Sequence, residues 1–304
     1  MYDTLIIGSG PAGMTAGLYA ARANLKVGII EQGALGGQMN NTSEIENYPG
    51  YDHISGPELS MKMHAPLEKF GVENIYGIVK SIEDAGDVKR VITEDATYEA
   101  KTIILATGAK NRALGVAGEE EYTSRGVSYC AVCDGAFFRN QDLLVIGGGD
   151  SAVEEAGYLT QFAKSVTIIH RRDELRAQKI LQDRAFANEK INFIWDSVVK
   201  EIKGNDIKVS GVVVENVKTG EISEHEFGGI FIYVGVDPVS KMIEGLGITD
   251  EAGWVITDDH MKTAIPGIFA IGDVRKKELR QITTAVGDGA IAGQGVYQYI
   301  ENMK

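Results

Sequence analysis

Cysteine is scarce in this chain. Only two of the 304 residues are cysteines, Cys130 and Cys133. In a reducing compartment a C-x-x-C pair indicates a catalytic, redox-sensing or metal-binding site sooner than a structural crosslink. A zinc site would need two further soft ligands, and the histidines are scattered without metal-ligand spacing. They are His53, His64, His170, His225 and His260. We therefore predict no metal site.

An excess of positive charge is also missing. The formal net charge is −13 and the sequence pI is near 4.9. Such a chain has no electrostatic footprint for nucleic acid or for an anionic membrane. We predict neither as a partner.

Near the N-terminus there is no long hydrophobic run. Asp3 stands where a signal peptide has lysine or arginine, and the apolar run that follows is too short for a secretory core or a membrane span. We expect the protein in the cytoplasm. A hydrophobic content of 44% over 304 residues is enough for more than one typical domain, so two domains are the initial expectation.

A glycine-rich turn opens the chain. An apolar strand over 4–8 runs into Gly8, Gly10, Pro11 and Gly13, and an alanine-rich helix is predicted over 14–22. Such glycines let the backbone turn sharply and approach a pyrophosphate at the helix N-terminus. A second strand over 26–30 ends at Glu31, whose carboxylate suits a bare ribose. We expect this site to bind FAD.

The same pattern recurs in the middle of the chain. A strand over 142–146 leads into Gly147, Gly149 and Ala152, followed by a helix over 153–162 and a strand over 165–169. His170 stands at the position that Glu31 occupies after the first turn, and Arg171, Arg172 and Arg176 follow it. Guanidinium groups bind a 2′-phosphate, whereas a carboxylate repels it, so this site favours NADPH over NADH. The alternative is that the arginines only cover a solvated helix face.

The last third of the chain returns to the first domain. A buried strand ending at Gly272 and Asp273 precedes an Ala/Gly-rich helix over 284–299, although an aspartate there also suits an ordinary strand-to-helix turn. Strands ending at Gly108 and Gly235 mark two crossings between halves, and alternating segments over 79–100 and 202–228 suit small antiparallel sheets. The predicted fold is α/β with two Rossmann-like dinucleotide-binding domains of the three-layer ββα type. An FAD-binding domain over 1–111 and 240–304 is interrupted by an NADPH-binding domain over 112–239.

These motifs together resemble the low-molecular-weight bacterial type of thioredoxin reductase over essentially the whole chain. The resemblance rests on both glycine turns, on 36–38 and 46–50, on Cys130 to Gly135, on 170–172 and on 272–274. It implies a homodimer formed through the FAD domain. It also implies FAD contacts at Gly36, Gly37, Gln38, Asn47, Asp273, Arg280, Gln281 and Ile282, and NADPH contacts at Ser151, His170, Arg171, Arg172 and Arg176.

The resemblance also predicts a reaction. Hydride passes from NADPH to the flavin, electrons move to the Cys130–Cys133 disulfide, and the dithiol reduces thioredoxin or a similar protein by thiol–disulfide exchange. Asp134 is the predicted general acid, with a simple turn-forming role as the alternative. Cys133 is expected nearer the flavin and Cys130 nearer the partner, but the order stays open.

Nicotinamide, disulfide and a protein substrate all need access to one small region. We therefore expect the inserted domain to rotate about its two connections between half-reactions. By resemblance, Arg125, Phe137 and Phe138 flank the redox site and contact thioredoxin. The alternative for the two aromatics is that one is core and one covers a turn.

Three other functions fit parts of this pattern. A reductase of a peroxiredoxin-linked system usually has an extra N-terminal redox domain and lacks the paired arginines. A ferredoxin-type NADP reductase of similar fold would lack both cysteines. A flavin-binding sensor that uses the dithiol as a switch would be reduced once and would not turn over.

Overall fold

The computed structural model describes residues 1–42, 45–123 and 125–303, and for Val132 and Cys133 it describes the backbone alone. The chain divides into two compact units. Unit 1 comprises Met1–Lys110 and Asp237–Lys304, and unit 2 comprises Asn111–Val236. The chain therefore crosses from unit 1 to unit 2 after Lys110 and returns after Val236. At the crossings, β7 (Ala109–Asn111) pairs with β16 (Val236–Pro238) as a two-stranded sheet.

Unit 1 is built around a parallel sheet. Strands β3, β2, β1 and β6 lie in that order, β17 pairs with β6, and the first half of β6 continues into an antiparallel meander with β5 and β4. The strands are β1 (Tyr2–Ile7), β2 (Val27–Glu31), β3 (Glu73–Tyr76), β4 (Val79–Ala85), β5 (Val88–Thr93), β6 (Thr97–Leu105) and β17 (Ile268–Ala270). The helices are α1 (Pro11–Arg22), α2 (Gly56–Lys69) and α7 (Ile282–Glu301), with short 3-10 turns η1 (Gly37–Asn41), η3 (Lys241–Ile243) and η4 (Gly272–Val274).

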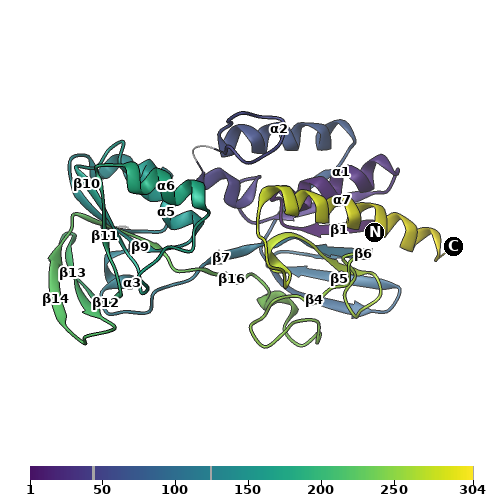
Figure 1. The fold of residues 1–304 in the computed structure, drawn as a ribbon. Coiled ribbons are helices and arrows are strands. Elements are labelled where there is room, and N and C mark those ends of the chain that lie inside the picture. Colours follow the sequence, from purple (N-terminus) through teal and green to yellow (C-terminus); the bar gives the residue numbers. More distant parts are fainter. Residues whose placement is uncertain (43–44, 124, 304) are drawn as a thin grey trace. The chain divides into compact units, whose positions relative to one another are not determined.

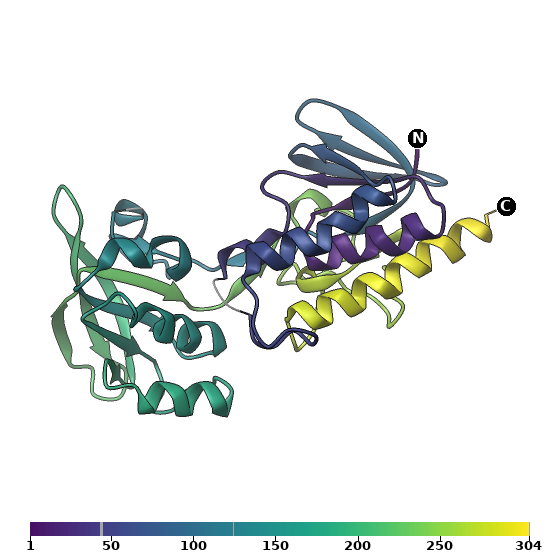
Figure 2. The ribbon, with the colours of Figure 1, turned by 90° about the horizontal axis from the view of Figure 1, so that it is seen from above.

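The side chains of β1 alternate between the two faces of the sheet, which explains why unit 1 has three layers. Ile6 belongs to a core with α1 and α7, whereas Leu5 and Ile7 belong to a second core with Ile82 and Val91 of the meander. Because successive strand residues point to opposite faces, a strand that is apolar on both faces needs a cover on each. Helices α1, α2 and α7 lie side by side on one face (Figure 2). Figure 1 shows β4 and β5 away from these helices, beyond β6.

Unit 2 repeats this design. A parallel sheet has the order β11-β10-β9-β15-β8, and a three-stranded antiparallel sheet has the order β12-β13-β14. The elements are α3 (Glu119–Tyr122), β8 (Val127–Ser128), α4 (Ala131–Asp134), η2 (Gly135–Phe138), β9 (Asp142–Gly147), α5 (Asp150–Leu159), β10 (Ser165–Ile169), α6 (Lys179–Ala187), β11 (Ile191–Ile194), β12 (Ser197–Gly204), β13 (Val209–Asn216), β14 (Ile222–Glu226) and β15 (Gly229–Tyr233). Leu143 and Val145 of β9 face the core under α5, and Leu144 and Ile146 face the core under the antiparallel sheet.

Both helices after the glycine turns begin earlier than the sequence pattern predicted. Helix α1 begins at Pro11 directly after Gly10, and α5 begins at Asp150 directly after Gly149. Proline suits this position because the first helical residues have no intrahelical acceptor for their N–H groups. Residues 171–178, between β10 and α6, form no helix, so the arginines there do not line a helix face. The amides of both glycine turns therefore lie directly at a helix N-terminus.

Candidate active site

The first glycine turn needs glycine for steric reasons. Gly8 has φ +102°, and a Cβ there would lie 2.4 Å from the Ala106 carbonyl oxygen. A Cβ on Gly13 would lie 2.0 Å from the Gly8 carbonyl oxygen. Gly10 differs, because no heavy atom of the described residues comes within 4 Å of its Cβ position. The turn is thus tightly packed on its inner side and open at Gly10, where a ligand can approach the backbone.

Glu31, predicted to accept hydrogen bonds from a ribose, is bonded to the glycine turn. One carboxylate oxygen accepts hydrogen bonds from the Ser9 amide at 2.9 Å and the Ser9 hydroxyl at 2.8 Å. The other accepts from the amides of Gln32 at 2.8 Å and Gly33 at 2.9 Å. The carboxylate therefore fixes the strand end against the glycine turn, and each of its oxygens already accepts two hydrogen bonds. Ser9 is a residue that the motif alone did not single out.

The next predicted residues continue around the opening. A Cβ on Gly37 would lie 3.3 Å from the Gly10 Cα, and a Cβ on Gly36 would lie 2.2 Å from the Ser60 hydroxyl. The Gln38 side chain donates to the Ala109 carbonyl at 3.4 Å. Residues 36 and 37 therefore pass directly beside the open glycine.

Residues far apart in the sequence meet at the start of α7. The Asn47 side chain donates to the Gln281 side chain at 3.1 Å. Gln281 caps α7 and forms a capping box with Thr284, so Ile282 is the first residue of the helix. The Arg280 guanidinium lies 3.8 Å from the centre of the Trp254 ring. The structure thus groups Asn47, Arg280, Gln281 and Ile282 at one helix N-terminus.

Asp273 has a buried carboxylate oxygen without a hydrogen bond. Among the described residues no donor reaches its Oδ1, and the ammonium of Lys277 is 4.0 Å away. Burial raises the pKa of Asp273, against the lowering effect of Lys277 and Arg280. A buried acceptor without a partner is costly to leave unpaired, so it fits a ligand that donates hydrogen bonds. The hydroxyl-rich chain of FAD is such a ligand, and these residues fit that cofactor.

Asp288 supports this corner and was not predicted. It lies on the buried face of α7, and its Oδ2 accepts from the Gly272 amide at 2.9 Å, from Arg275 at 2.9 Å and from Lys277 at 3.1 Å. An aspartate inside an Ala/Gly-rich helix was the only sequence signal available for it. Asp288 holds the backbone just before Asp273.

The second glycine turn has the same construction. Gly147 has φ +153°, and a Cβ there would lie 2.4 Å from the Tyr233 carbonyl oxygen. A Cβ on Gly148 would lie 2.5 Å from the His170 ring. Gly149 is open, since nothing in the described part of the chain comes within 4 Å of its Cβ position. Ala152 is buried beneath the turn, and Ser151 is exposed at the N-terminus of α5.

Positive side chains gather beside this turn. His170 is 5% exposed, and its Nε2 has no hydrogen-bond partner among the described residues. Burial, and then the charges of Arg176, Arg171 and Arg172, lower the pKa of His170. The Arg176 amide donates to the Gly148 carbonyl at 2.7 Å, which brings the arginine loop back to the turn. Three exposed arginines on the loop that returns to the turn fit an anionic group, as the 2′-phosphate of NADPH requires.

The loop between the arginines and α6 is fixed by Asp150, which the motif alone did not identify. Its carboxylate accepts from the Gln178 amide at 2.7 Å and from the Gln178 side chain at 2.8 Å. Because Asp150 is the first residue of α5, this pair holds the loop at the N-terminus of that helix.

The redox segment lies in the same unit as the second glycine turn. Cys130 is disulfide-bonded, and the sequence holds one other cysteine, Cys133, whose side chain lies outside the described residues. The Ala131 amide, at the start of α4, donates to the Tyr233 hydroxyl at 3.0 Å. Asp134 ends α4, and its carboxylate accepts from the Ser128 hydroxyl at 2.6 Å. Asp134 is also the N-cap residue of η2, where its side chain makes no cap hydrogen bond.

Comparisons with known proteins agree across the chain. A family model described as pyridine nucleotide-disulphide oxidoreductase matches residues 2–289. Curated thioredoxin reductases of Listeria monocytogenes and Bacillus subtilis are 57% and 55% identical, each over 100% of this chain and 95% and 96% of their own lengths. The chain belongs to the thioredoxin reductase family. The predicted family, the α/β fold with two Rossmann-like domains, the enzyme class and the cofactors FAD and NADPH are thereby confirmed.

Solved structures of thioredoxin reductases differ in how well they superpose. The Lactococcus lactis enzyme in its FR conformation is 68% identical and gives a TM-score of 0.99 over 99% of this chain and 100% of that chain. The Streptococcus pyogenes enzyme is 79% identical but gives a TM-score of 0.68 over 99% of each chain. Sequence identity and overall superposition therefore do not rank these two relatives in the same order.

The three residues predicted to dock thioredoxin differ from one another in exposure and in the contacts they make. Phe137 is 78% exposed, whereas Phe138 packs edge-on against Phe231 at 5.4 Å between ring centres. The Arg125 guanidinium donates to the Glu121 and Asp206 carbonyls, and it lies 5.5 Å from the centre of the Tyr122 ring. Phe138 and Arg125 are thus already engaged within unit 2, and Phe137 is the residue that points outward.

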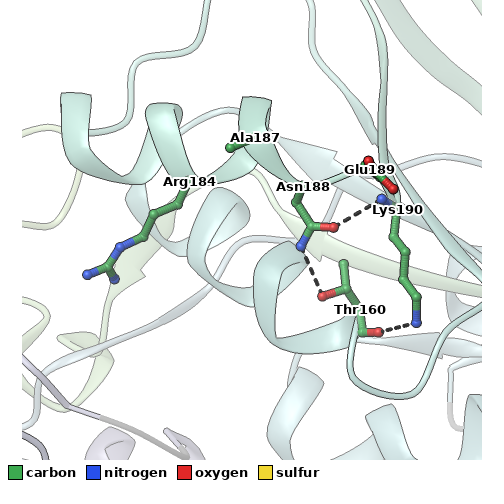
Figure 3. A pocket seen from close by; sticks show the side chains of 6 residues that line it. All are labelled: Thr160, Arg184, Ala187, Asn188, Glu189 and Lys190. Carbon is green, nitrogen blue, oxygen red and sulfur yellow. Dashed lines mark hydrogen bonds between the residues drawn. The ribbon is translucent and has the colours of Figure 1, made fainter.

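A hollow elsewhere in unit 2 contains none of the predicted site residues. It lies between the ends of α5 and α6 and is lined by Thr160, Arg184, Ala187, Asn188, Glu189 and Lys190 (Figure 3). The Lys190 ammonium donates to the Thr160 and Ala163 carbonyls at 2.8 and 3.1 Å. This lysine is therefore already committed within the fold.

Two further features concern metals and membranes. Within residues 1–42, 45–123 and 125–303, no cluster of His, Cys, Asp or Glu has the makings of a metal site. In the same ranges no helix is both long enough and apolar enough to cross a bilayer.

Proposed function

We propose that this thioredoxin reductase passes electrons from NADPH through FAD to the disulfide of Cys130 and Cys133, and from there to thioredoxin. The observation that carries this proposal is the placement of a disulfide-bonded Cys130 in the unit that also holds the arginine-flanked glycine turn. A hydride donor and a dithiol in one unit suit a two-electron relay.

Unit 1 is the proposed FAD domain. Gly8, Gly10, Pro11 and Gly13 shape the pyrophosphate turn, and the amides at the start of α1 supply its positive end. Glu31 at the end of β2 is the proposed acceptor for the ribose. The other proposed contacts are Gly36, Gly37, Gln38, Asn47, Asp273, Arg280, Gln281 and Ile282. The open side of Gly10 and the unpaired Oδ1 of Asp273 support this assignment.

Unit 2 is the proposed NADPH domain. Gly147, Gly149, Ser151 and Ala152 form its pyrophosphate turn. His170, Arg171, Arg172 and Arg176 bind the 2′-phosphate, so the enzyme prefers NADPH to NADH. Burial and the neighbouring arginines lower the pKa of His170, whose ring offers a hydrogen bond beside the three guanidinium groups.

The dithiol reduces its partner by exchange. When bound, FAD accepts a hydride from NADPH and supplies two electrons to the disulfide. One cysteine thiolate attacks a partner sulfur, the partner S–S bond breaks, and the departing thiolate takes a proton. The second cysteine attacks the mixed disulfide, which restores the Cys130–Cys133 bond and releases the second partner thiol. Asp134 is the proposed proton donor.

The two units must move relative to each other between half-reactions. Nicotinamide and a protein disulfide need the same small region, and the chain has no third cysteine to carry electrons outward. The connections contain Gly108 with φ +69° and Gly235 with φ +118°, positions suited to hinges. The solved relatives agree with such motion, because the relative of higher identity, at 79%, gives the lower TM-score of 0.68, and displacement of whole units lowers a TM-score.

Thioredoxin docks on unit 2 near the redox segment. Phe137 supplies the exposed aromatic contact, Phe138 supports it from the core, and Arg125 shapes the neighbouring surface. We also propose a homodimer formed through unit 1 and a cytoplasmic location, where a C-x-x-C pair cycles as dithiol and disulfide.

An anaerobic titration tests the proposal. NADPH is expected to bleach the flavin absorbance, and oxidised thioredoxin is expected to restore it through many cycles. NADH at equal concentration should be a much poorer donor. A flavin that is bleached once and not restored by thioredoxin would contradict the proposal and favour a sensor.

A further inference from the structure

Ser128 links the cysteine backbone to the proposed proton donor. It ends β8, two residues before Cys130, and is 5% exposed. Its hydroxyl donates to Asp134 Oδ2 at 2.6 Å and accepts from the Cys130 amide at 3.0 Å. Strand β8 pairs with β15 at Val127 and Ser128, so the serine is held by the parallel sheet.

The hydroxyl has one proton to give. Among the described residues, its two acceptors in reach are Asp134 Oδ2 at 2.6 Å and the Cys130 carbonyl at 3.3 Å. The shorter contact, to a carboxylate, is the stronger one. Oδ2 is therefore committed as an acceptor, and Oδ1 is left as the oxygen that carries a proton when Asp134 is neutral.

We propose that Ser128 is a positioning residue that orients Asp134, so that Asp134 delivers its proton from Oδ1 during dithiol–disulfide exchange. This inference rests on the proposed role of Asp134. The proton goes from Oδ1 to the thiolate that leaves when the partner S–S bond breaks, and Asp134 is left ionised. The Ser128 hydroxyl stabilises that ionised carboxylate, and its bond from the Cys130 amide keeps the acid in register with the cysteine segment.

Other titratable groups surround this pair. Tyr233 at the end of β15 interacts electrostatically with Asp134, and Glu155 of α5 interacts with Tyr233. Cys130 lies on the same segment, and its carbonyl accepts from the Asp134 amide at 3.2 Å. A pH profile of the whole reaction therefore contains several ionisations, and a double-variant design is needed to isolate the effect of Ser128.

The test uses the FAD-loaded enzyme and single-turnover kinetics. Enzyme reduced in advance is mixed with oxidised thioredoxin, and the rate of thioredoxin reduction is measured from pH 5 to 10. The variants are Ser128→Ala, the isosteric pair Ser128→Val and Ser128→Thr, Asp134→Asn, and Ser128→Ala with Asp134→Asn. If Ser128→Ala fails to fold, Ser128→Val and Ser128→Thr still provide the comparison, because valine has a methyl group where threonine has the hydroxyl.

We expect Ser128→Ala and Ser128→Val to slow the reaction about tenfold, because the general acid is no longer oriented. Asp134→Asn should slow it about 100-fold, because the general acid itself is lost. Ser128→Thr should stay within about twofold of the wild type, because it keeps the hydroxyl. Recovery of the rate in Ser128→Thr but not in Ser128→Val separates orientation through the hydroxyl from a purely structural role, because the two side chains have nearly the same shape.

The double variant separates the two proposals. If Ser128 acts through Asp134, adding Ser128→Ala to Asp134→Asn should cause no further loss. An unimpaired Asp134→Asn variant would overturn the proposed acid. An impaired Asp134→Asn variant together with unimpaired Ser128→Ala and Ser128→Val, or fully additive losses, would overturn the role of Ser128 alone.

Discussion

At the residue scale, the site is defined by which polar atoms are satisfied within the chain and which are not. Glu31, Asp288 and Asp150 accept hydrogen bonds from backbone amides and hold backbone turns in place. Asp273 and His170 each keep a buried polar atom without a hydrogen bond among the described residues. Native proteins pair most buried polar groups, so these atoms are where ligands are expected to bind.

The two open glycines give a matched prediction. Gly10 and Gly149 have ordinary φ values of −66° and −93°, and an added Cβ meets no described atom. Gly10→Ala should leave the stability of the cofactor-free protein within about 0.5 kcal/mol but weaken FAD binding. Gly149→Ala should keep FAD and raise the KM for NADPH. Bound flavin after purification and steady-state kinetics are the measurements, and unchanged binding of both cofactors would contradict the assignment.

Glu155 predicts how stability depends on pH. Burial, and then the charge of Glu154, raises the pKa of Glu155 to about 8, and no described donor reaches its Oε2. Because the pKa of Glu155 is raised in the folded state, its contribution to the free energy of unfolding is present at low pH and is lost as the pH rises toward 8. The free energy of unfolding falls by at most about 1.4 kcal/mol per pH unit through this group.

Glu155→Gln should remove this dependence. Thermal unfolding from pH 5 to 9 is the measurement, with exposed Glu120→Gln as the control. The variant should lose less stability than the wild type over this range, and parallel curves would show that Glu155 is ionised throughout.

At the element scale, hydrogen bonds to one buried glutamate, Glu119, join the residue before Cys130 to the stretch of chain that enters unit 2. Burial alone would raise the pKa of Glu119, but hydrogen bonds from Tyr129 and from the amides of Leu114 and Gly115 lower it. The three bonds measure 2.5, 2.7 and 2.6 Å. Glu119 thus joins the chain entering unit 2 to the residue before Cys130.

Glu119→Ala should lower the free energy of unfolding by about 1–3 kcal/mol, because it leaves buried donors unpaired. The matched control is Glu120→Ala on the exposed side of the same short helix, which should change it by less than about 0.5 kcal/mol. Urea denaturation measures both. Equal effects of the two variants would show that the Glu119 bonds do not contribute.

The elements that sequence could predict are those with a periodic apolar pattern or a steric motif. The strands and helices of both glycine turns follow from this, apart from their first residues. Ser128, Asp288 and Glu119 could not be found in this way, because each acts through contacts with residues that only the fold brings together. Phe137 and Phe138 are neighbours with the same side chain, and only the position of Phe231 decides that Phe138 packs inward.

At the scale of the whole molecule, one chain crosses twice between two units that each bury their own cores. Paired strands β7 and β16 form the connection, and glycines with positive φ lie beside it. The proposed rotation of whole units would take place about this connection and would leave both cores intact.

Joining the units covalently tests this motion. A short crosslink between one residue of each unit should abolish NADPH-dependent turnover with thioredoxin while preserving one half-reaction, either flavin reduction by NADPH or disulfide reduction by reduced flavin. The same protein with a cleavable crosslink is the control, since cleavage should restore turnover. Full turnover in the crosslinked state would exclude the rotation.

The central claim is that electrons reach thioredoxin only through Cys130 and Cys133. Its most direct test is anaerobic stopped-flow spectroscopy of the Cys130→Ser and Cys133→Ser variants. NADPH should bleach the flavin in both variants as in the wild type, yet thioredoxin should not be reduced catalytically by either. Sustained thioredoxin reduction by either variant would contradict the account.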